Sequence, residues 1–238
     1  MSAEDFFNLH RDLPRQGPGE AADVAWLGEQ VDLPDDARIA DLACGPGADI
    51  GPLLALAKGA SVTAIDRQPQ FIEEAHAKWG NDPRVDLLCG DMIEPGGPYD
   101  LIWCAGAVYI LGVTKALNMW RSAMSSTGLI AFSQICFWDK HPPADLRDFW
   151  AQEYPAMSDI DGIDSWVQAA GYKTLATRRL SADAWESYYR PLEQRIARLQ
   201  EDAEPDLLRV LENTKTEIKT YRQFGKHFGY LLSVVRPA

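Results

Sequence analysis

The chain has 238 residues, and its 46% hydrophobic content is enough to build the core of one domain, which excludes a disordered or fibrous protein. Its formal charge of −12, with Lys and Arg spread along the chain, argues against nucleic acid and favours a small-molecule partner, unless folding assembles a local basic patch. The N-terminus is acidic where a secretory leader would be basic, and no run approaches about 18 apolar residues, so we expect a cytoplasmic protein without a membrane partner.

An N-terminal helical segment is expected over residues 1–31, with a turn at Arg15–Gly19 and a helix over Glu20–Val31. From residue 38 to 137, short apolar runs alternate with amphipathic stretches, a pattern typical of strands and helices in a parallel α/β sheet. The predicted strands are RIADLAC, ASVTAID, RVDLLCG, YDLIWCA and GLIAFSQICF. The predicted helices are Ile50–Lys58, Pro69–Trp79 and Thr114–Met124.

The C-terminal part of the chain predicts further helices and two more strands. A helix over Asp161–Ala170 is expected to end at Gly171, before the strand YKTLATRRL. Residues 181–226 carry apolar residues at helical spacing, and we interpret them as two helices broken near Pro205. We expect these helices to be an insertion in a single domain, 1–238, that precedes the last strand, FGYLLSVV.

A glycine-rich loop follows the first predicted strand, in the segment Asp41-Leu42-Ala43-Cys44-Gly45-Pro46-Gly47. Glycines let the backbone approach a ligand closely and adopt positive φ angles. The loops that follow parallel strands gather at one edge of the sheet, where ligands usually bind. Alone, the loop is compatible with many nucleotide-binding proteins and with an ordinary tight turn.

Acidic residues end three consecutive predicted strands. Asp66 is placed where a carboxylate can accept hydrogen bonds from both hydroxyls of a ribose, and Arg67 follows it. Asp91 can accept from an adenine amine while Met92 packs on the ring, and Asp41 can orient the loop or meet an amino group. Each aspartate could instead cap a helix. Together the three match one adenosyl ligand, whose lack of a phosphate fits the absence of Lys and Arg from the loop.

On these motifs the chain resembles the class I S-adenosylmethionine-dependent methyltransferases. Asp41 to Gly47 is similar to their first motif, with Ala43 where many members have glycine, and Asp66 and Asp91 match their ribose and adenine positions. The resemblance implies S-adenosyl-L-methionine as the cofactor. It also implies a Rossmann-like, doubly wound α/β fold whose seven-stranded, mostly parallel sheet has an antiparallel last strand. We expect Ala43 to tighten the loop slightly and to leave cofactor binding intact.

A narrower resemblance, to a bacterial group of small-molecule methyltransferases that mostly lack an assigned substrate, covers nearly the whole chain. It rests on the segments RQGPG, GAVYILG, DFWAQEYPAM and FGYLLSVV. Some relatives have an acidic residue before the glycine of the GAVY-like segment, where this chain has Ala105. The site residues predicted for the cofactor are Asp41, Ala43, Gly45, Gly47, Asp66, Arg67, Asp91, Met92 and Ala105.

No catalytic base stands out, and the candidates for one are Tyr109, His141 and Tyr154. Around a methyl acceptor we expect further aromatic and acidic residues, which could equally be core: Trp138, Trp150, Glu153, Trp185, Tyr188 and Tyr189. The segment Arg15–Gly19 is expected to be either a lid over the cofactor or a linker.

No structural metal is predicted, because the histidines and cysteines lack zinc-ligand spacing. The four cysteines, Cys44, Cys89, Cys104 and Cys136, are expected to be buried reduced thiols.

The sequence predicts S-adenosylmethionine-dependent methyl transfer to a small molecule and leaves two alternatives open. One is a regulatory protein that binds the cofactor without catalysis, an interpretation that Ala105 sustains. The other is a nicotinamide-dependent oxidoreductase, although the spacing of Gly45, Gly47 and Gly51 does not satisfy GxGxxG. The acceptor atom and the oligomeric state are not predicted.

Overall fold

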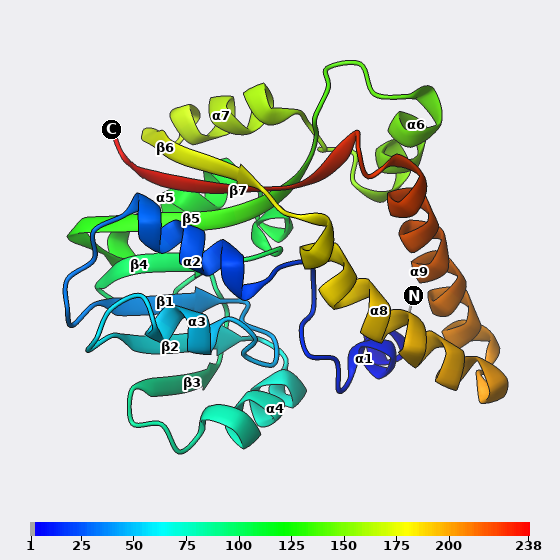
Figure 1. Ribbon diagram of the computed structural model, residues 1–238, viewed down its shortest axis with the longest axis horizontal. Helices are drawn as coiled ribbons and strands as arrows, with labels where there is room; N and C mark the ends of the chain where they lie inside the picture. The colour runs from blue at the N-terminus through cyan, green and yellow to red at the C-terminus, as the bar shows by residue number, and fades with distance from the viewer. Residues whose placement is uncertain (1–2) are drawn as a thin grey trace.

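The computed structural model describes residues 3–238, in which strands and helices alternate through most of the chain (Figure 1). Residues 1 and 2 of the expected N-terminal segment lie outside the described residues. The strands of the described part are β1 Arg38–Leu42, β2 Ser61–Asp66, β3 Val85–Cys89, β4 Tyr99–Cys104, β5 Met124–Phe137, β6 Tyr172–Arg179 and β7 Phe228–Pro237. The helices are α1 Ala3–His10, α2 Ala21–Gln30, α3 Ile50–Leu54, α4 Pro69–Trp79, α5 Val113–Trp120, α6 Ala144–Glu153, α7 Ile160–Ala169, α8 Ala182–Leu199 and α9 Pro205–Phe224. Short 3-10 helices are η1 Val108–Ile110, η2 Arg121–Ala123 and η3 Gln200–Asp202.

The strands form one sheet in the order β3-β2-β1-β4-β5-β7-β6. Strands β1 to β5 are parallel, whereas β7 is antiparallel to both of its neighbours, β5 and β6. The predicted fold, a doubly wound, mostly parallel sheet with an antiparallel last strand, is therefore confirmed. The strand order reverses between β1 and β4, and a sheet of this kind forms its ligand crevice at the carboxyl ends of the strands beside such a reversal.

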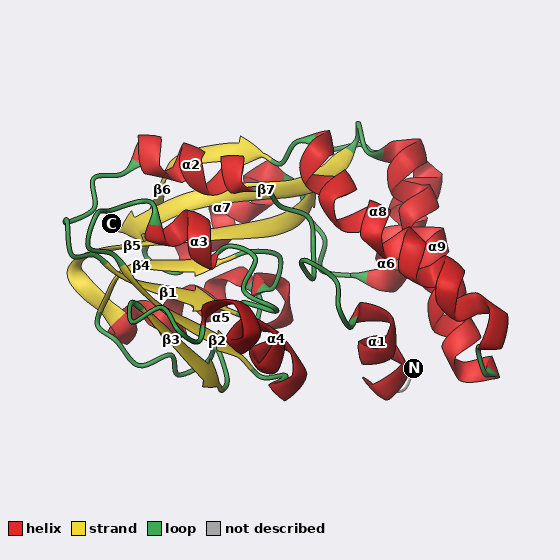
Figure 2. Cartoon of the chain, turned by 60° about the horizontal axis from the view of Figure 1, so that its bottom comes forward, coloured by secondary structure: helices red, strands yellow, loops and turns green. Residues whose placement is uncertain are grey.

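Helices cover both faces of the sheet (Figures 1 and 2). On one face, α2, α3 and α4 bury an apolar core through residues such as Leu27 and Leu53, which are fully buried. On the other face, α5 and α7 bury a second core through Trp120 and Val167. The sheet is thus the rigid centre of the domain, and its strand ends are held in place from both sides.

A third apolar core lies beyond the carboxyl ends of the parallel strands, where α1, α6, α8 and α9 gather (Figure 2). Leu9 of α1, Trp185 of α8 and Leu211 of α9 are buried there, against the near ends of β5 and β7. The Ser181 hydroxyl caps α8 by accepting a hydrogen bond from the backbone N–H of Ala184 at 3.0 Å. Helix α9 begins at Pro205, the residue near which the sequence predicts a break.

Helices α3 and α5 and strand β5 differ from their predicted limits, and one helix was not predicted. Helix α3 ends at Leu54, four residues early, because the Ala60 N–H donates to the Ala57 carbonyl and turns the chain into β2. Helix α5 ends at Trp120, and β5 begins at Met124, where the predicted helix ended, with a shift of register against β4. Helix α6 was not predicted, because its sequence lacks a clear apolar stripe and buries only Leu146.

The exposed thiol of Cys89 shows that the prediction of four buried cysteines is wrong at this residue. Strand β3 is an edge strand and most of its side chains are exposed. The other three cysteines are buried, and burial raises the pKa of the Cys136 thiol to about 12.

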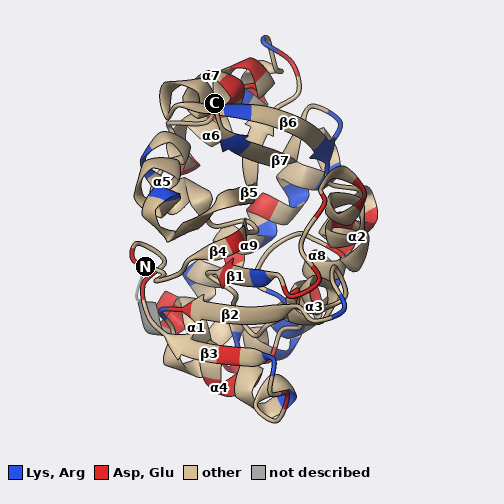
Figure 3. Ribbon diagram, turned by 90° about the vertical axis from the view of Figure 1, so that its left-hand side faces the viewer, with Lys and Arg blue, Asp and Glu red and all other residues tan. Residues whose placement is uncertain are grey.

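Lys and Arg (blue) and Asp and Glu (red) are spread over strands and helices in the ribbon of Figure 3. Among residues 3–238, no helix combines the length and the apolar character that crossing a bilayer requires. Within the same residues, no cluster of three or more His, Cys, Asp or Glu side chains could hold a metal ion.

Candidate functional site

A cavity of about 400 Å³ lies at the carboxyl ends of β1 to β4. The loops that follow these four strands line it on one side, and residues 15–18 with Phe6 and Phe7 of α1 line it on the other. We call it the sheet-edge cavity. Its volume is within the range of about 300–1,000 Å³ that is usual for small-molecule sites.

The glycine-rich loop after β1 has the left-handed backbone that the sequence predicts. Ala43 has a φ of 56° and Gly45 a φ of 53°, and both residues line the sheet-edge cavity. The backbone N–H of Gly45 donates to Oδ2 of Asp66 at 2.9 Å. Asp66 therefore holds this loop by a hydrogen bond.

Replacing Ala43 by glycine is expected to stabilise the protein by about 0.5–1 kcal/mol. A left-handed conformation costs an L-residue about 1–2 kcal/mol, a cost that glycine avoids. The extra freedom of glycine in the unfolded chain offsets about 0.4–1 kcal/mol of this gain in stability. Urea unfolding measures the change. Ala203, with a φ of −75°, provides the control, since Ala203→Gly should only destabilise. Equal losses in the two variants would contradict strain at Ala43.

Gly47 is the one predicted cofactor residue that does not line the sheet-edge cavity. Its φ is 76°, and its carbonyl accepts a hydrogen bond from the indole N–H of Trp79 at 3.0 Å. A Cβ atom at this position would lie 2.8 Å from Cδ1 of Ile50. The glycine is thus required for packing of the loop against α3 and α4, and a direct cofactor contact is not supported.

Asp41, at the end of β1, has a buried carboxylate on the wall of the sheet-edge cavity, with an exposed fraction of 3%. Its Oδ2 atom has no hydrogen-bond partner. Burial, and then the negative charges of Asp49 and Asp66, hold the pKa of Asp41 well above its usual range, although Arg15 acts in the opposite direction. Buried acceptors are usually paired with a donor, which a ligand in the cavity can supply as well as water.

The Asp66 carboxylate ends β2 and makes two backbone hydrogen bonds, to Gly45 and, through Oδ1, to the N–H of Gln68 at 2.8 Å. Burial raises the pKa of Asp66, and these two bonds partly counteract it. A carboxylate has about four lone-pair sites, so about two remain for a ligand. Arg67, the next residue, is exposed and lies at the rim of the same cavity.

The loop after β3 contributes Asp91 and Met92 to the sheet-edge cavity. Asp91 is exposed, and its Oδ1 accepts from the backbone N–H of Ile93 at 3.0 Å. Met92 is buried, and its carbonyl accepts from the indole N–H of Trp120 at 2.6 Å. Trp120 thereby anchors this loop to α5. After β4, Ala105 lines the cavity as well.

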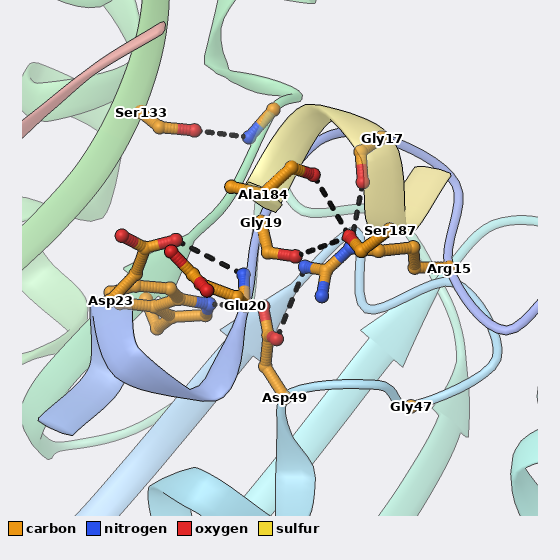
Figure 4. Close-up of polar contacts among 12 residues, drawn as sticks. Arg15, Gly17, Gly19, Glu20, Asp23, Gly47, Asp49, Ser133, Ala184 and Ser187 are labelled. Atoms are coloured by element: carbon orange, nitrogen blue, oxygen red, sulfur yellow. Dashed lines mark hydrogen bonds and ion pairs between the residues drawn. The ribbon is translucent and has the colours of Figure 1, made fainter. Parts of the chain in front are cut away.

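Residues 15–18 line the sheet-edge cavity, and polar contacts hold the segment 15–19 in place at both ends (Figure 4). The Arg15 guanidinium pairs with Oδ1 of Asp49 at 3.3 Å, and the Trp103 indole donates to Oδ2 of the same carboxylate at 3.0 Å. The Gly19 carbonyl accepts from the Ser187 hydroxyl of α8 at 2.8 Å. This segment is a wall of the cavity, and Arg15 meets a carboxylate of the protein itself.

A second cavity, of about 310 Å³, lies among α1, α6, α8 and α9. We call it the helical cavity. It shares six lining residues with the sheet-edge cavity, namely Phe6, Gln16, Gly17, Pro18, Gly106 and Tyr109. A ligand in one cavity would therefore adjoin a ligand in the other.

Solved structures of two bacterial proteins share this fold over almost their whole length. One is an S-adenosylmethionine-dependent methyltransferase from Thiobacillus denitrificans in complex with S-adenosyl-L-homocysteine, with a TM-score of 0.82, 19% identity, and coverage of 100% of this chain and 99% of that chain. The other, an S-adenosylmethionine-dependent methyltransferase from Geobacter sulfurreducens in complex with the same ligand, has a TM-score of 0.80, 18% identity, and coverage of 100% and 99%. At these identities the likeness shows the fold.

The family comes from the sequence matches. Residues 39–128 match the family described as a methyltransferase domain. The chain is also 29% identical over 174 residues to a trans-aconitate 2-methyltransferase of Streptomyces avermitilis, a match that covers 68% of this chain and 65% of that relative, just under two thirds of its length. The chain is therefore similar to the class I S-adenosylmethionine-dependent methyltransferases, in sequence over residues 39–128 and in fold. The predicted resemblance is confirmed, and the oxidoreductase alternative is set aside.

The three candidate bases are placed very differently. Tyr109 lines both cavities, and Tyr154, whose ring centroid is 5.8 Å from that of Tyr109, lines the helical cavity. His141, in the loop between β5 and α6, is exposed and lines neither cavity. We therefore drop His141 as a candidate.

Of the other side chains expected around a methyl acceptor, four line the helical cavity: Trp150, Glu153, Trp185 and Tyr188. Trp138 and Tyr189 do not. The sequence analysis missed His10 and Glu217, which both line it. Helical spacing offered one signal, because Glu217 follows the buried Val210 by seven residues and so lies on the same face of α9.

Proposed function

We propose that this methyltransferase transfers the methyl group of S-adenosyl-L-methionine to a small-molecule acceptor. The observation that carries the proposal is the buried carboxylate of Asp41, whose Oδ2 lacks a partner, in a cavity that adjoins a second one. The ligand of the Thiobacillus and Geobacter structures supports the cofactor, and the name of the Streptomyces relative supports a small acceptor.

The residues of the sheet-edge cavity fit the cofactor group by group. Asp41 would accept from the α-ammonium group of the methionine part, which supplies both a donor and a positive charge. The two free lone-pair sites of Asp66 would accept from the two ribose hydroxyls. Asp91 and Met92 would hold the adenine. Ala43 and Gly45 would contact the methionine part, with Ala105 and the rim residue Arg67 beside them.

Positioning carries most of the proposed catalysis. The cofactor supplies a methyl group on a sulfonium, which is a good leaving group for in-line displacement. Tyr109 and Gln16, at the junction of the cavities, would hold an acceptor behind that methyl group. Orientation of this kind contributes roughly 7 to 11 kcal/mol, whereas a general base adds about 10²- to 10⁴-fold in rate. Orientation can therefore supply more of the rate than a general base does.

We propose further that residues 1–238 act as one methyltransferase domain, in which the helical insertion 181–226 forms a wall of the acceptor site. With a formal charge of −12, the protein would act in the cytoplasm on small molecules, without nucleic-acid or membrane partners.

The Asp66→Ala variant is expected to bind S-adenosyl-L-methionine about ten- to a hundredfold more weakly than the unmodified protein. Hydrogen bonds to a charged group contribute roughly 1.5 to 3 kcal/mol each, and the variant also loses the bond that holds Gly45. Isothermal calorimetry measures the affinity, and circular dichroism checks the fold. Asp86→Ala, which removes an exposed acid from β3, should bind normally. An unchanged affinity in a folded Asp66→Ala protein would rule out the ribose assignment.

Release of S-adenosylhomocysteine separates catalysis from the alternative of a non-catalytic cofactor-binding protein. The full chain is incubated with S-adenosyl-L-methionine and a panel of small amines, phenols, thiols and carboxylates. We expect turnover with at least one class. Cofactor binding without release across the panel would favour the non-catalytic alternative.

A further inference from the structure

The helical cavity is walled mainly by aromatic rings. These belong to Phe6, Tyr109, Phe149, Trp150, Tyr154, Trp185, Tyr188 and Tyr230. Aromatic faces carry partial negative charge and attract cations, most strongly where water is excluded. The wall is therefore suited to an apolar ligand or to one with a positively charged group.

The charged side chains that line the helical cavity are acids. Glu153 is exposed at its edge and Glu217 is half-buried in its wall, and no Lys or Arg is among the described lining residues. His10 adds no positive charge, because burial lowers its pKa. Its Nδ1 lies 2.8 Å from the Phe6 carbonyl and must donate to it, which leaves Nε2 to accept from the Tyr188 hydroxyl at 3.1 Å.

Glu217 has no cationic partner in the part of the chain that the structure describes. Its Oε1 accepts a hydrogen bond from the Tyr189 hydroxyl at 2.9 Å. Other acids of the same helices form ion pairs, as Glu212 does with Lys215 at 2.7 Å. Burial raises the pKa of Glu217, and the nearby charge of Glu153 adds to this. A carboxylate in such a setting is stabilised by a cation brought by a ligand.

Glu217 lines the helical cavity together with Tyr109, one of the residues that the two cavities share. Desolvation, and after it the negative charge of Glu217, raises the pKa of Tyr109, which lines both cavities. A positive group held by Glu217 would therefore lie next to the cofactor site, whereas a carboxylate ligand would meet two acids and no base.

We propose that the methyl acceptor is a small amine, which binds as its ammonium ion between the carboxylate of Glu217 and the aromatic wall of the helical cavity. This inference rests on the proposed function. Before transfer, the ammonium ion gives one proton to the Glu217 carboxylate. The nitrogen lone pair then forms the new N–C bond while the C–S bond breaks. The electron pair of that bond passes to sulfur, and the positive charge passes to nitrogen.

Three probes of the same shape test the charge preference: benzylamine, benzyl alcohol and benzoate. Each is titrated by calorimetry into the full chain saturated with S-adenosylhomocysteine. We expect benzylamine to bind at least about tenfold more tightly than benzyl alcohol, and benzoate to bind more weakly than either. Incubation of benzylamine with S-adenosyl-L-methionine should yield N-methylbenzylamine, identified by mass spectrometry.

Glu217→Gln removes the negative charge and keeps an oxygen that can accept from Tyr189. It should abolish the preference for benzylamine over benzyl alcohol. Glu212→Gln, which changes an exposed acid of the same helix, should keep it. The affinity for S-adenosylhomocysteine is measured on each protein and should be unchanged, which also shows that the variants are folded.

The outcomes separate the two proposals. If S-adenosylhomocysteine binds normally, three results would overturn the proposal of an amine acceptor and leave the proposed function standing. They are binding of benzyl alcohol or benzoate as tight as that of benzylamine, no binding of benzylamine, and an intact preference for benzylamine in Glu217→Gln. Failure of the unmodified protein to bind S-adenosylhomocysteine would overturn both.

Discussion

The Asp41→Asn variant is expected to be more stable than the unmodified protein without cofactor, and to bind S-adenosyl-L-methionine about 10- to 150-fold more weakly. The Asp41 carboxyl has a raised pKa in the folded state, so it holds its proton more tightly there than in the unfolded chain, where the pKa is near 3.8. Stability is therefore lost as the pH rises above 3.8 towards the folded-state pKa. Asparagine avoids this loss but cannot pair with an ammonium group, which costs roughly 1.5 to 3 kcal/mol of binding.

Urea unfolding between pH 4 and 7 measures the stability gain, which we expect to grow with pH and to reach about 1 kcal/mol or more at pH 7. Asp49→Asn is the matched control, because Asp49 is also buried but its carboxylate is satisfied by Arg15 and Trp103. It should lose stability. A loss of stability in Asp41→Asn, or an unchanged affinity for the cofactor, would show that the Asp41 carboxylate does not bind a positive group of the cofactor.

Trp185→Ala is expected to lower the free energy of unfolding by about 3–5 kcal/mol, the usual cost of truncating a buried aromatic residue. The Trp185 ring is 3% exposed and stacks on Tyr221 with centroids 4.1 Å apart, which joins α8 to α9. It also lies 6.1 Å from the ring of Phe228 at the start of β7. Removal of this indole therefore weakens the attachment of the helical insertion to the sheet.

Urea unfolding followed by tryptophan fluorescence and by circular dichroism measures this loss. One transition, coincident by both probes, is expected if the insertion and the sheet unfold together. Trp26→Ala, which truncates a half-buried indole of α2, should cost clearly less. A loss below about 1 kcal/mol in Trp185→Ala, or two separate transitions in the unmodified protein, would contradict a single cooperative domain.

The sheet and the three strand-end acids were predictable because each depends on a local pattern. Apolar runs of strand length ending in Asp41, Asp66 and Asp91 place all three carboxylates at one edge, and all three line the sheet-edge cavity. The order of the strands, with β7 between β5 and β6, comes from long-range pairing and was not predicted; the family resemblance implied only that the last strand is antiparallel.

Two predicted site residues, Gly47 and His141, do not line the cavities. In each case the local sequence pattern is compatible with a ligand site and also with a purely structural role. Gly47 has the positive φ angle expected of a ligand-binding loop, but Trp79 and Ile50 fill the space that a side chain would need. His141 follows β5 as a site residue would, but it is exposed and lines neither cavity. The loop backbone alone does not distinguish these cases.

The helical cavity was only partly predictable, because it is formed by elements distant in sequence. Glu217 is one of many acids on two polar helices, and only the packing of α1 and α6 against α9 encloses it. Its spacing from Val210 indicates the buried face of α9, but not that a cavity lies there. The aromatic candidates could be singled out because aromatic residues are few in this segment of the sequence. Acidic residues are common in a charged helix, so Glu217 did not stand out.

Calorimetric titration of the full chain with S-adenosyl-L-methionine, and separately with NADH, tests the central claim most directly. We expect one S-adenosyl-L-methionine to bind per chain, with an affinity that Asp66→Ala lowers and Asp86→Ala does not, and no binding of NADH. Binding of NADH without binding of S-adenosyl-L-methionine would contradict the assignment of the sheet-edge cavity.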